Sequence, residues 1–193
     1  MPRLQPVPAR SAGRLVGLAS RYARRRFGAV PEPFGVMTHA PAVLWANAVH
    51  ESMVERSWTR LDRALREIAV LRAALTVDCP WCVDFGTHLS EQGGVPRAKL
   101  EAVADWRASE LFSPLERQVL DYAEALSETP LRATDAMVAD LERDLGADGV
   151  VELTAYVALE NSRSRFNAAL GIGAQGFRDG DFRDGSCRVP ASR

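Results

Sequence analysis

The sequence predicts an all-α protein, one compact body of several packed helices. From Pro41 to about Leu170, apolar residues recur every three or four positions, the period of helices that bury one face. No segment shows a convincing alternation of apolar and polar residues, and no Asn-Gly pair marks a hairpin. Capping residues, prolines and glycines stand where the periodic pattern starts and stops. These observations favour helices packed on helices.

The composition is that of a soluble globular chain with one sizeable core. Of its 193 residues, 47% are hydrophobic and 25% are charged, and the formal net charge is -1. A charge this close to zero gives no general attraction to nucleic acid. The chain has no apolar run of about 18 residues, so we expect no transmembrane segment. With only three cysteines, a secreted disulfide framework is not expected, and a reducing cytoplasm is the expected location.

Residues 1–30 are predicted to form a basic helical arm. Residues 1–31 hold seven arginines and no acidic residue, and from Ser11 the apolar residues follow helical spacing at Leu15, Leu18, Ala19, Tyr22 and Ala23. Such a helix could be a transit peptide, a membrane-surface helix or an arm that docks on an acidic neighbour. The simpler alternative is a peripheral helix whose arginines face water.

The predicted helical body, residues 31–172, begins after an extended connector at 30–33, where Pro31 and Pro33 restrict the backbone. A helix over 41–58 would bury Leu44, Ala48 and Met53 on one side. A second, over 60–77, presents its apolar face at Leu61, Leu65, Ile68, Leu71 and Leu75. Glu67 lies inside this second helix beside apolar neighbours.

Clear stop and start signals divide the rest of the body. A third helix begins around Cys79 and Pro80 and ends before Gly93, and Pro96 opens a fourth. Ser113 and Glu116 have the spacing of a capping box, which predicts a helix over 114–127. Further boundaries are a break at 129–130, a helix that Thr134 caps and Gly146 ends, and a long helix from Asp148 to about Leu170.

Residues 173–193 are rich in Gly, Asp and Arg and are predicted to be an irregular tail. The phrase Phe-Arg-Asp-Gly occurs twice in it, from Phe177 and from Phe182, and could anchor the tail on the body or on a neighbouring subunit. Cys187 also lies here, and we interpret it as an incidental exposed thiol.

Cys79 and Cys82, spaced Cys-Pro-Trp-Cys, carry the most chemistry in the sequence. The pair could close a disulfide, hold a metal or be two small buried side chains. At a helix N-terminus the unpaired amides favour thiolate, and the first cysteine of such a pair is usually the more exposed. Together with His88 the pair supplies at most three ligands, so we expect neither a metal nor another cofactor. A thioredoxin fold is rejected because the preceding residues have helical spacing.

Beyond this pair, the chain resembles the superfamily of carboxymuconolactone decarboxylase and alkylhydroperoxidase D, which are small all-helical proteins. The resemblance covers roughly residues 34–172. It includes Glu67 twelve residues before Cys79, the segment 115–126 before a Thr-Pro break, and the segment VELTAYVALENSRSRFNAALGI at 151–172. It implies a compact domain of the alkylhydroperoxidase D type with the cysteine pair at a helix N-terminus.

In the peroxidase branch of that superfamily, the second cysteine attacks the peroxide and the first resolves it. The resemblance therefore implies Cys82 as peroxidatic thiol, Cys79 as resolving and exchanging thiol, and Glu67 as a carboxylate of the proton relay. The family's relay histidine would stand at Gly86. His88 is two residues further on, about 200° around the helix, so it cannot take that place. Glu67 acting through water across the gap at Gly86 is our hypothesis; Asp84, His50 or His88 are the possible auxiliary residues.

The resulting functional hypothesis is a thiol-dependent peroxidase or disulfide oxidoreductase. Its expected partners are a small hydroperoxide and an external thiol protein, and the family implies a homo-oligomer, a trimer or a hexamer. The alternative is a non-catalytic or redox-sensing helical oligomer whose surface binds a partner. Decarboxylation is disfavoured because that branch needs no redox thiols.

Overall fold

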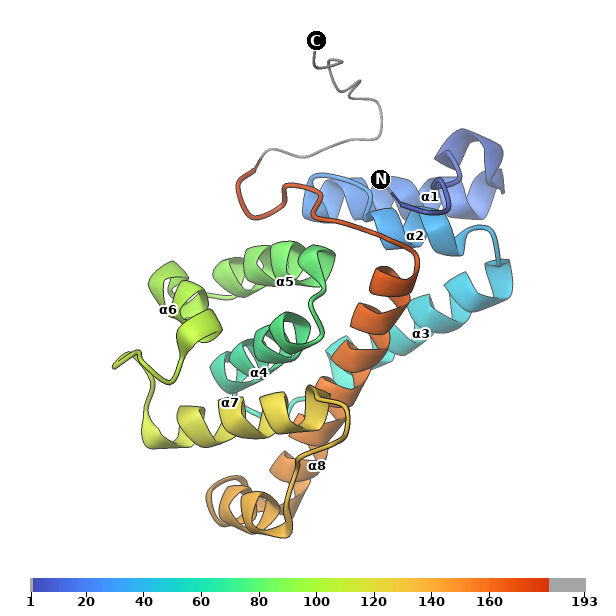
Figure 1. Cartoon of the computed structure of the whole chain (residues 1–193). Coiled ribbons are helices and arrows are strands. Elements are labelled where there is room, and N and C mark those ends of the chain that lie inside the picture. The colour runs from blue at the N-terminus through green and yellow to red at the C-terminus, as the bar shows by residue number, and fades with distance from the viewer. Residues whose placement is uncertain (1, 181–193) are drawn as a thin grey trace.

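The computed structural model describes residues 2–180, and all regular secondary structure in that range is helical. The elements are arranged as one body in which α4 lies between α5 and α7 and against α8 (Figure 1). In chain order they are η1 (Ala9–Ser11), α1 (Gly13–Phe27), α2 (Glu32–Met37), α3 (Pro41–Ser57), α4 (Arg63–Thr76), α5 (Pro80–Gln92), α6 (Arg97–Ala102), η2 (Val103–Asp105), α7 (Pro114–Ser127) and α8 (Asp135–Ala169).

The predicted helix boundaries are confirmed where a capping residue marked them. Ser113 and Glu116 form the complete capping box of α7, and the Thr134 hydroxyl accepts the Met137 amide at the start of α8. Asp62 caps α4 in the same way, slightly later than predicted. At Gly146, φ of +73° interrupts α8, so the two helices predicted there follow each other across a kink.

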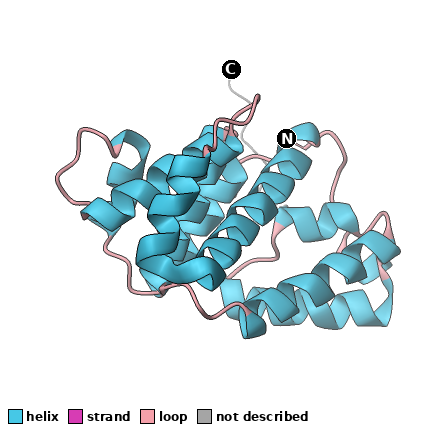
Figure 2. Cartoon of the chain, turned by 90° about the horizontal axis from the view of Figure 1, so that it is seen from below, coloured by secondary structure: helices cyan, strands magenta, loops and turns pink. Residues whose placement is uncertain are grey.

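Figure 2 shows the all-helical body from below. Its main core lies between α4, α7 and α8. Ile68, Val119 and Leu153 come from these three helices, and each is 0% exposed. Burial of such side chains contributes roughly 1.5–3 kcal/mol each before ordering entropy is subtracted. This rigid set of helices supports the first turn of α5, where the cysteine pair lies. Within residues 2–180, no helix is long and apolar enough to cross a membrane.

The apolar face predicted for α3 is wrong in part. Leu44 is buried, but Met53 is 60% exposed. Nine residues separate them, which turns the helix by about 900° and places them on opposite sides. On α1, the predicted amphipathic helix, the buried residues are Val16, Ser20 and Ala23, whereas Leu15, Leu18 and Tyr22 are exposed.

Both ends of the described chain fold back on the helical body. The Arg3 amide donates to the Leu170 carbonyl at 2.7 Å, and the Val7 amide donates to the Gly35 carbonyl at 3.0 Å. After α8, the chain continues over α5 as the strap, residues 172–178 (red in Figure 1). Phe177, in the first Phe-Arg-Asp-Gly phrase, is 1% exposed. The second phrase and Cys187 lie outside the described residues.

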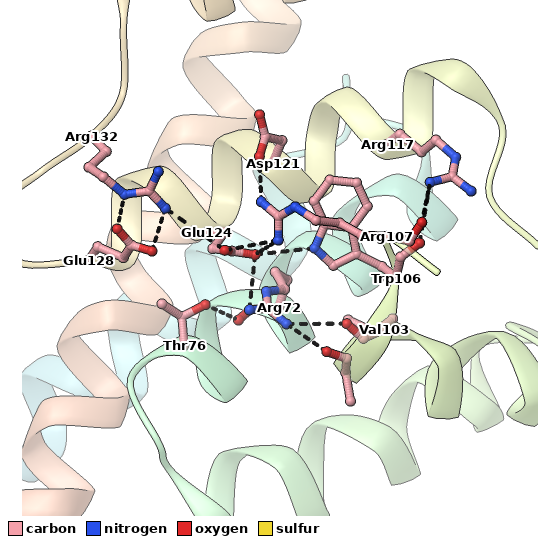
Figure 3. A network of polar contacts seen from close by, with 11 residues as sticks. Arg72, Thr76, Val103, Trp106, Arg107, Arg117, Asp121, Glu124, Glu128 and Arg132 are labelled. Carbon is pink, nitrogen blue, oxygen red and sulfur yellow. Dashed lines mark hydrogen bonds and ion pairs between the residues drawn. The ribbon is translucent and has the colours of Figure 1, made fainter. Parts of the chain in front are cut away.

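A network of ion pairs joins α4, the segment around η2, and α7 (Figure 3). At its centre the Glu124 carboxylate accepts from Arg72 at 2.9 Å, Arg107 at 2.9 Å and the Trp106 indole at 3.2 Å. Burial alone would raise the pKa of Glu124. The hydrogen bonds from Arg107 and Trp106 and the charge of Arg72 outweigh that effect and hold the pKa below its usual range.

Candidate functional site

Cys79 and Cys82 are joined by a disulfide at the start of α5. Asp78 adopts φ of +58°, which turns the chain sharply out of α4, and the Cys79 amide returns to the Ala74 carbonyl at 3.0 Å. Cys79 is then the N-cap of α5 and Pro80 follows in the first turn. The Cα atoms of the two cysteines are 5.3 Å apart, within the usual range for a disulfide.

The position of Cys79 gives its sulfur a hydrogen bond from the helix backbone. The Cys82 amide donates to Cys79 Sγ at 3.2 Å, so the sulfur takes the place that a Ser or Asp oxygen takes in most caps. When the disulfide is reduced, this bond and the partial positive charge of the helix N-terminus both favour a thiolate at Cys79.

The order of burial predicted for the two cysteines is wrong. Cys79 is 1% exposed and Cys82 is 6% exposed, so the first cysteine is not the more accessible one. Both cysteines belong to an apolar cluster that the strap closes over the start of α5. Its buried members are Ala29, Val36, Ala74, Cys79, Trp81, Cys82, Ile172 and Phe177.

Polar side chains of α8 line the other side of the disulfide. Ser164 Oγ lies 3.3 Å from Cys82 Sγ, and Asn167 Nδ2 lies 3.3 Å from the same sulfur and 3.9 Å from Cys79 Sγ. Ser164 is 0% exposed and Asn167 is 2% exposed. The hydroxyl and the amide can stabilise a negative charge on this buried sulfur, which water does not reach.

Behind Ser164 stands a buried carboxyl group. Glu160 Oε1 lies 3.1 Å from Ser164 Oγ, and Glu160 Oε2 accepts from Arg163 at 3.2 Å. Arg163 also donates to Glu51 on α3 at 2.8 Å. Burial raises the pKa of Glu160, and the nearby charge of Arg163 opposes the rise without cancelling it.

Glu67 lies on α4 in a similar arrangement with a different serine. Its carboxylate accepts from Ser90 Oγ at 2.9 Å and from Arg66 at 2.6 Å. Ser90 Oγ also lies 2.8 Å from the Gly86 carbonyl. Among residues 2–180, no hydrogen bond joins Glu67 to either cysteine. A Cβ at Gly86 would meet nothing within 4 Å, so the place of the family's histidine is open space.

The structure gives Asp84 a different task from the auxiliary catalytic one. Its carboxylate accepts the backbone amides of residues 175, 176, 177 and 178, at 2.7 to 3.1 Å, and so holds the strap on α5. His88 lies 3.0 Å from the Gln92 amide, and its ring is 5.8 Å from the ring of Phe177. His50, on the exposed side of α3, packs edge-on against Trp58. Neither histidine hydrogen-bonds a cysteine within the described part of the chain.

A cavity of about 350 Å³ lies at the Cys79 end of the site, between α4, α5 and the strap. Leu75, Pro80 and Val83 form apolar parts of its wall, and Arg178 and Asp179 stand at the strap side. A second cavity of about 200 Å³ shares Leu75, Val83 and Arg178 with it. For residues 2–180, no cluster of three or more His, Cys, Asp or Glu side chains could hold a metal ion.

Sequence similarity defines the family of this chain. The model of the carboxymuconolactone decarboxylase family matches residues 41–125. The protein YnjA of Escherichia coli (strain K12) is 36% identical over 170 residues, which cover 88% of each protein. The chain belongs to the carboxymuconolactone decarboxylase family.

Other similar proteins extend the comparison to known chemistry and known folds. An alkyl hydroperoxide reductase of Mycobacterium tuberculosis is 31% identical over 94 residues, 47% of this chain and 26% of that protein. The crystal structure of the debrominase Bmp8 with 2,3,4-tribromopyrrole has a TM-score of 0.80 at 18% identity, over 92% of this chain and 94% of that one. An alkylhydroperoxidase AhpD core protein of Ralstonia eutropha has a TM-score of 0.75 at 19% identity, covering 95% and 98%. These two structures show that the fold is shared.

Sequence reasoning alone missed the polar residues that α8 places at the site of this family member. Ser164 and Asn167 contact the sulfurs, and Glu160 contacts Ser164. The three residues follow each other at spacings of four and three, so they occupy one face of a helix. Buried apolar residues, Leu153 and Val157, precede them on the same helix. The sequence signal that could have found the three polar residues is that they continue the buried apolar face of this helix.

Proposed function

We propose that the protein is a thiol-dependent redox enzyme that reduces hydroperoxides and cycles between the Cys79–Cys82 disulfide and the dithiol. The observation that carries this proposal is the disulfide itself, at a helix N-terminus and with polar side chains of α8 on its sulfurs. The sequence similarity to an alkyl hydroperoxide reductase supports the same chemistry.

In this proposal the two cysteines have different roles. Cys82, next to Ser164 and Asn167, attacks the peroxide, because these groups can stabilise its thiolate. Cys79 then closes the disulfide. Cys79 also lines the cavity between α5 and the strap, and we place the approach of an external dithiol there. Such a reductant requires a reducing compartment, which favours the cytoplasm.

The test is to count thiols after stoichiometric oxidation. Fully reduced protein carrying Cys187→Ser is mixed with one equivalent of cumene hydroperoxide, and free thiols are titrated over time. The expected result is the loss of both remaining thiols and the formation of one disulfide. Cys82→Ser should consume peroxide no faster than buffer. If the parent protein keeps its thiols and the peroxide persists, hydroperoxide reduction is not its function, and a redox-sensing or purely structural pair becomes the better explanation.

A second candidate reaction is reductive dehalogenation, because a structure with one of the high TM-scores is that of a debrominase. A dithiol can supply the two electrons that replace bromide by hydrogen, ending as the same disulfide. The reduced protein is incubated with 2,3,4-tribromopyrrole and bromide release is measured. Release that matches disulfide formation one for one would favour this reaction, and its absence alongside peroxide consumption would eliminate it.

We also propose that the protein self-associates, as the family resemblance implies. One side of α3 presents apolar side chains to solvent in the single chain: Val49 is 59% exposed and Met53 is 60% exposed, and Trp45 lies on the same side. A second copy of the chain is the partner we assign to this face.

A further inference from the structure

A chain of polar groups leads from Cys82 into α8 and ends at a buried carboxyl group. We propose that Ser164 and Glu160 form the proton relay of Cys82 and do on α8 what the family's histidine would do at Gly86. This inference rests on the proposed hydroperoxide chemistry and assigns a pathway for its protons.

The geometry of the chain is continuous. Ser164 Oγ lies 3.3 Å from Cys82 Sγ and 3.1 Å from Glu160 Oε1. Ser164 is 0% exposed and Glu160 is 4% exposed, so bulk water does not compete for these hydrogen bonds. Residues 160 and 164 are one helical turn apart, which keeps the carboxyl and the hydroxyl adjacent.

The hydrogen-bond directions favour a protonated Glu160. A serine hydroxyl has one hydrogen, so Ser164 cannot donate to the sulfur and to a carboxylate together. If Glu160 carries a proton, Glu160 donates to Ser164 and Ser164 donates to Cys82. Burial favours this form because it raises the pKa of the Glu160 carboxyl. The other titratable or charged groups facing Glu160 are Arg163 on α8, Glu51 from α3 through Arg163, and Cys82 from α5.

The relay balances the peroxidase step. In the reduced protein, Cys82 and Glu160 share one proton. When this proton moves from the Cys82 thiol through Ser164, Glu160 becomes the protonated carboxyl described above and Cys82 becomes the thiolate. The thiolate attacks the terminal peroxide oxygen, so an S–O bond forms and the O–O bond breaks. Glu160 returns the proton through Ser164 to the leaving alkoxide, and the products are an alcohol and a sulfenic acid at Cys82. The Cys79 thiol then attacks that sulfur, the disulfide forms and water leaves.

Glu67 and Ser90 are the rival relay. They form a carboxylate–serine pair at 2.9 Å on the neighbouring helices α4 and α5. The Ser90 hydroxyl lies close to the Gly86 carbonyl and has no hydrogen bond to a cysteine within residues 2–180. Glu160 is therefore one hydroxyl away from Cys82, whereas Glu67 would need additional water.

The first measurement uses no peroxide. In reduced protein carrying Cys79→Ser and Cys187→Ser, so that no second thiol titrates beside Cys82, the rate of Cys82 alkylation by iodoacetamide is followed by mass spectrometry between pH 5 and 10. Because Cys82 and Glu160 share a proton, the parent protein should show two inflections. Glu160→Gln should show one. An identical profile in the parent and in Glu160→Gln overturns the relay.

The second measurement compares proton delivery with thiol reactivity. At pH 7, Glu160→Gln and Ser164→Ala should slow peroxide-driven disulfide formation by about 100-fold or more, the usual size of general acid–base catalysis. At the high-pH plateau of the profile, where Cys82 is all thiolate, alkylation needs no proton donor and should change by less than about threefold. Ser164→Thr keeps a hydroxyl and should retain most of the peroxide rate.

Matched controls separate the relay from damage to the helix. Glu152→Gln and Ser127→Ala remove buried groups of the same kind that bind only backbone or Asn161, and both should keep the parent rate and profile. Equal losses in these controls overturn the relay, as does a loss in Glu67→Gln that Glu160→Gln does not show. If the parent protein shows two alkylation inflections but reduces no peroxide, the proposed function fails while the proton coupling of Cys82 and Glu160 stands.

Discussion

At the scale of single residues, the site depends on small differences in what surrounds each sulfur. Cys79 Sγ accepts a hydrogen bond from a backbone amide of its own helix. Cys82 Sγ contacts a side-chain hydroxyl and a side-chain amide from α8. The two thiols therefore differ in how their negative charge would be stabilised, although both are almost fully buried. This asymmetry supports separate roles for attack and for disulfide exchange.

Gly86 is a residue whose replacement should stabilise the protein. It lies inside α5 with helical geometry, and a Cβ there would meet nothing within 4 Å. Gly86→Ala removes the conformational freedom that glycine has in the unfolded chain, worth roughly 0.5–1 kcal/mol. The melting temperature should rise by about 1–4 °C in a calorimetric scan.

Gly94 provides the contrast for this substitution. It has φ of +90°, so Gly94→Ala should lower the melting temperature although space around it is also open. A fall in melting temperature for Gly86→Ala would show that the open space at α5 is occupied in solution.

At the scale of elements, the strap packs over the start of α5 beside the disulfide, and we expect it to limit access to the sulfurs. Asp84 accepts four consecutive strap amides, and Trp81 donates to Gln175 at 3.2 Å. In Asp84→Asn, the side-chain NH₂ group would face the backbone amides of the strap, so that hydrogen-bond donors would face each other. Reduction of the disulfide by dithiothreitol should accelerate by about tenfold, since ~1.4 kcal/mol of lost local stability corresponds to that factor.

Hydrogen exchange locates this effect. The amides of residues 175–178 should exchange faster in Asp84→Asn, while amides in the α4 core keep their protection. Asp148→Asn changes an exposed aspartate at the start of the second half of α8 and should leave both measurements unchanged. Unchanged reduction kinetics in Asp84→Asn would mean that the strap does not cover the reactive path.

The network around Glu124 should make the packing of α7 on α4 sensitive to acid. The folded pKa of Glu124 lies below the unfolded value of about 4.3, so its stabilisation is complete above that value. It is lost as the pH falls through the lower folded pKa. Glu124→Gln should cost about 2–3 kcal/mol in urea unfolding at pH 7, because Arg72 loses its carboxylate partner in a site only 15% exposed.

The same measurement has a matched control one turn later on α7. Glu128 pairs with Arg132 at the surface, and Glu128→Gln should have little effect on stability at pH 7 or in acid. As the pH falls below the unfolded value of about 4.3, the difference between the parent and Glu124→Gln should shrink. A constant difference from pH 3 to 7 would mean that the carboxylate charge is not what stabilises the network.

How far the sequence predicts these elements depends on the range of the interactions. Caps such as Ser113 and Thr134 act within four residues, so they were readable from local spacing. The exposure of Met53 and the burial of Cys79 depend on which distant segment covers each helix face. For the same reason, spacing placed Glu67 on its helix, but the contact between α8 and Cys82 could be recognised only in the folded structure.

At the scale of the whole molecule, two helices present apolar stripes that no other segment of residues 2–180 covers. On α1 the stripe consists of Leu15, Leu18 and Tyr22, and Arg26 of this helix pairs with Glu55 of α3. The α3 stripe contains Val49 and Met53. A soluble monomer rarely exposes large contiguous apolar patches, which supports the proposed association of copies through α3.

Charge placed on the α3 stripe should therefore dissociate the oligomer. In V49E/M53E, two carboxylates would have to be buried without partners, which costs several kcal/mol per interface and should shift the mass by light scattering to that of the 21.1 kDa chain. Val151→Glu, at a 69% exposed valine on α8, serves as the control and should keep the parent mass. Because Glu51 of α3 binds Arg163, which in turn binds Glu160, dissociation should also change the Cys82 alkylation profile if the interface supports that ion pair. An unchanged mass in V49E/M53E would exclude α3 as the contact and leave the exposed stripe of α1 as the next face to charge.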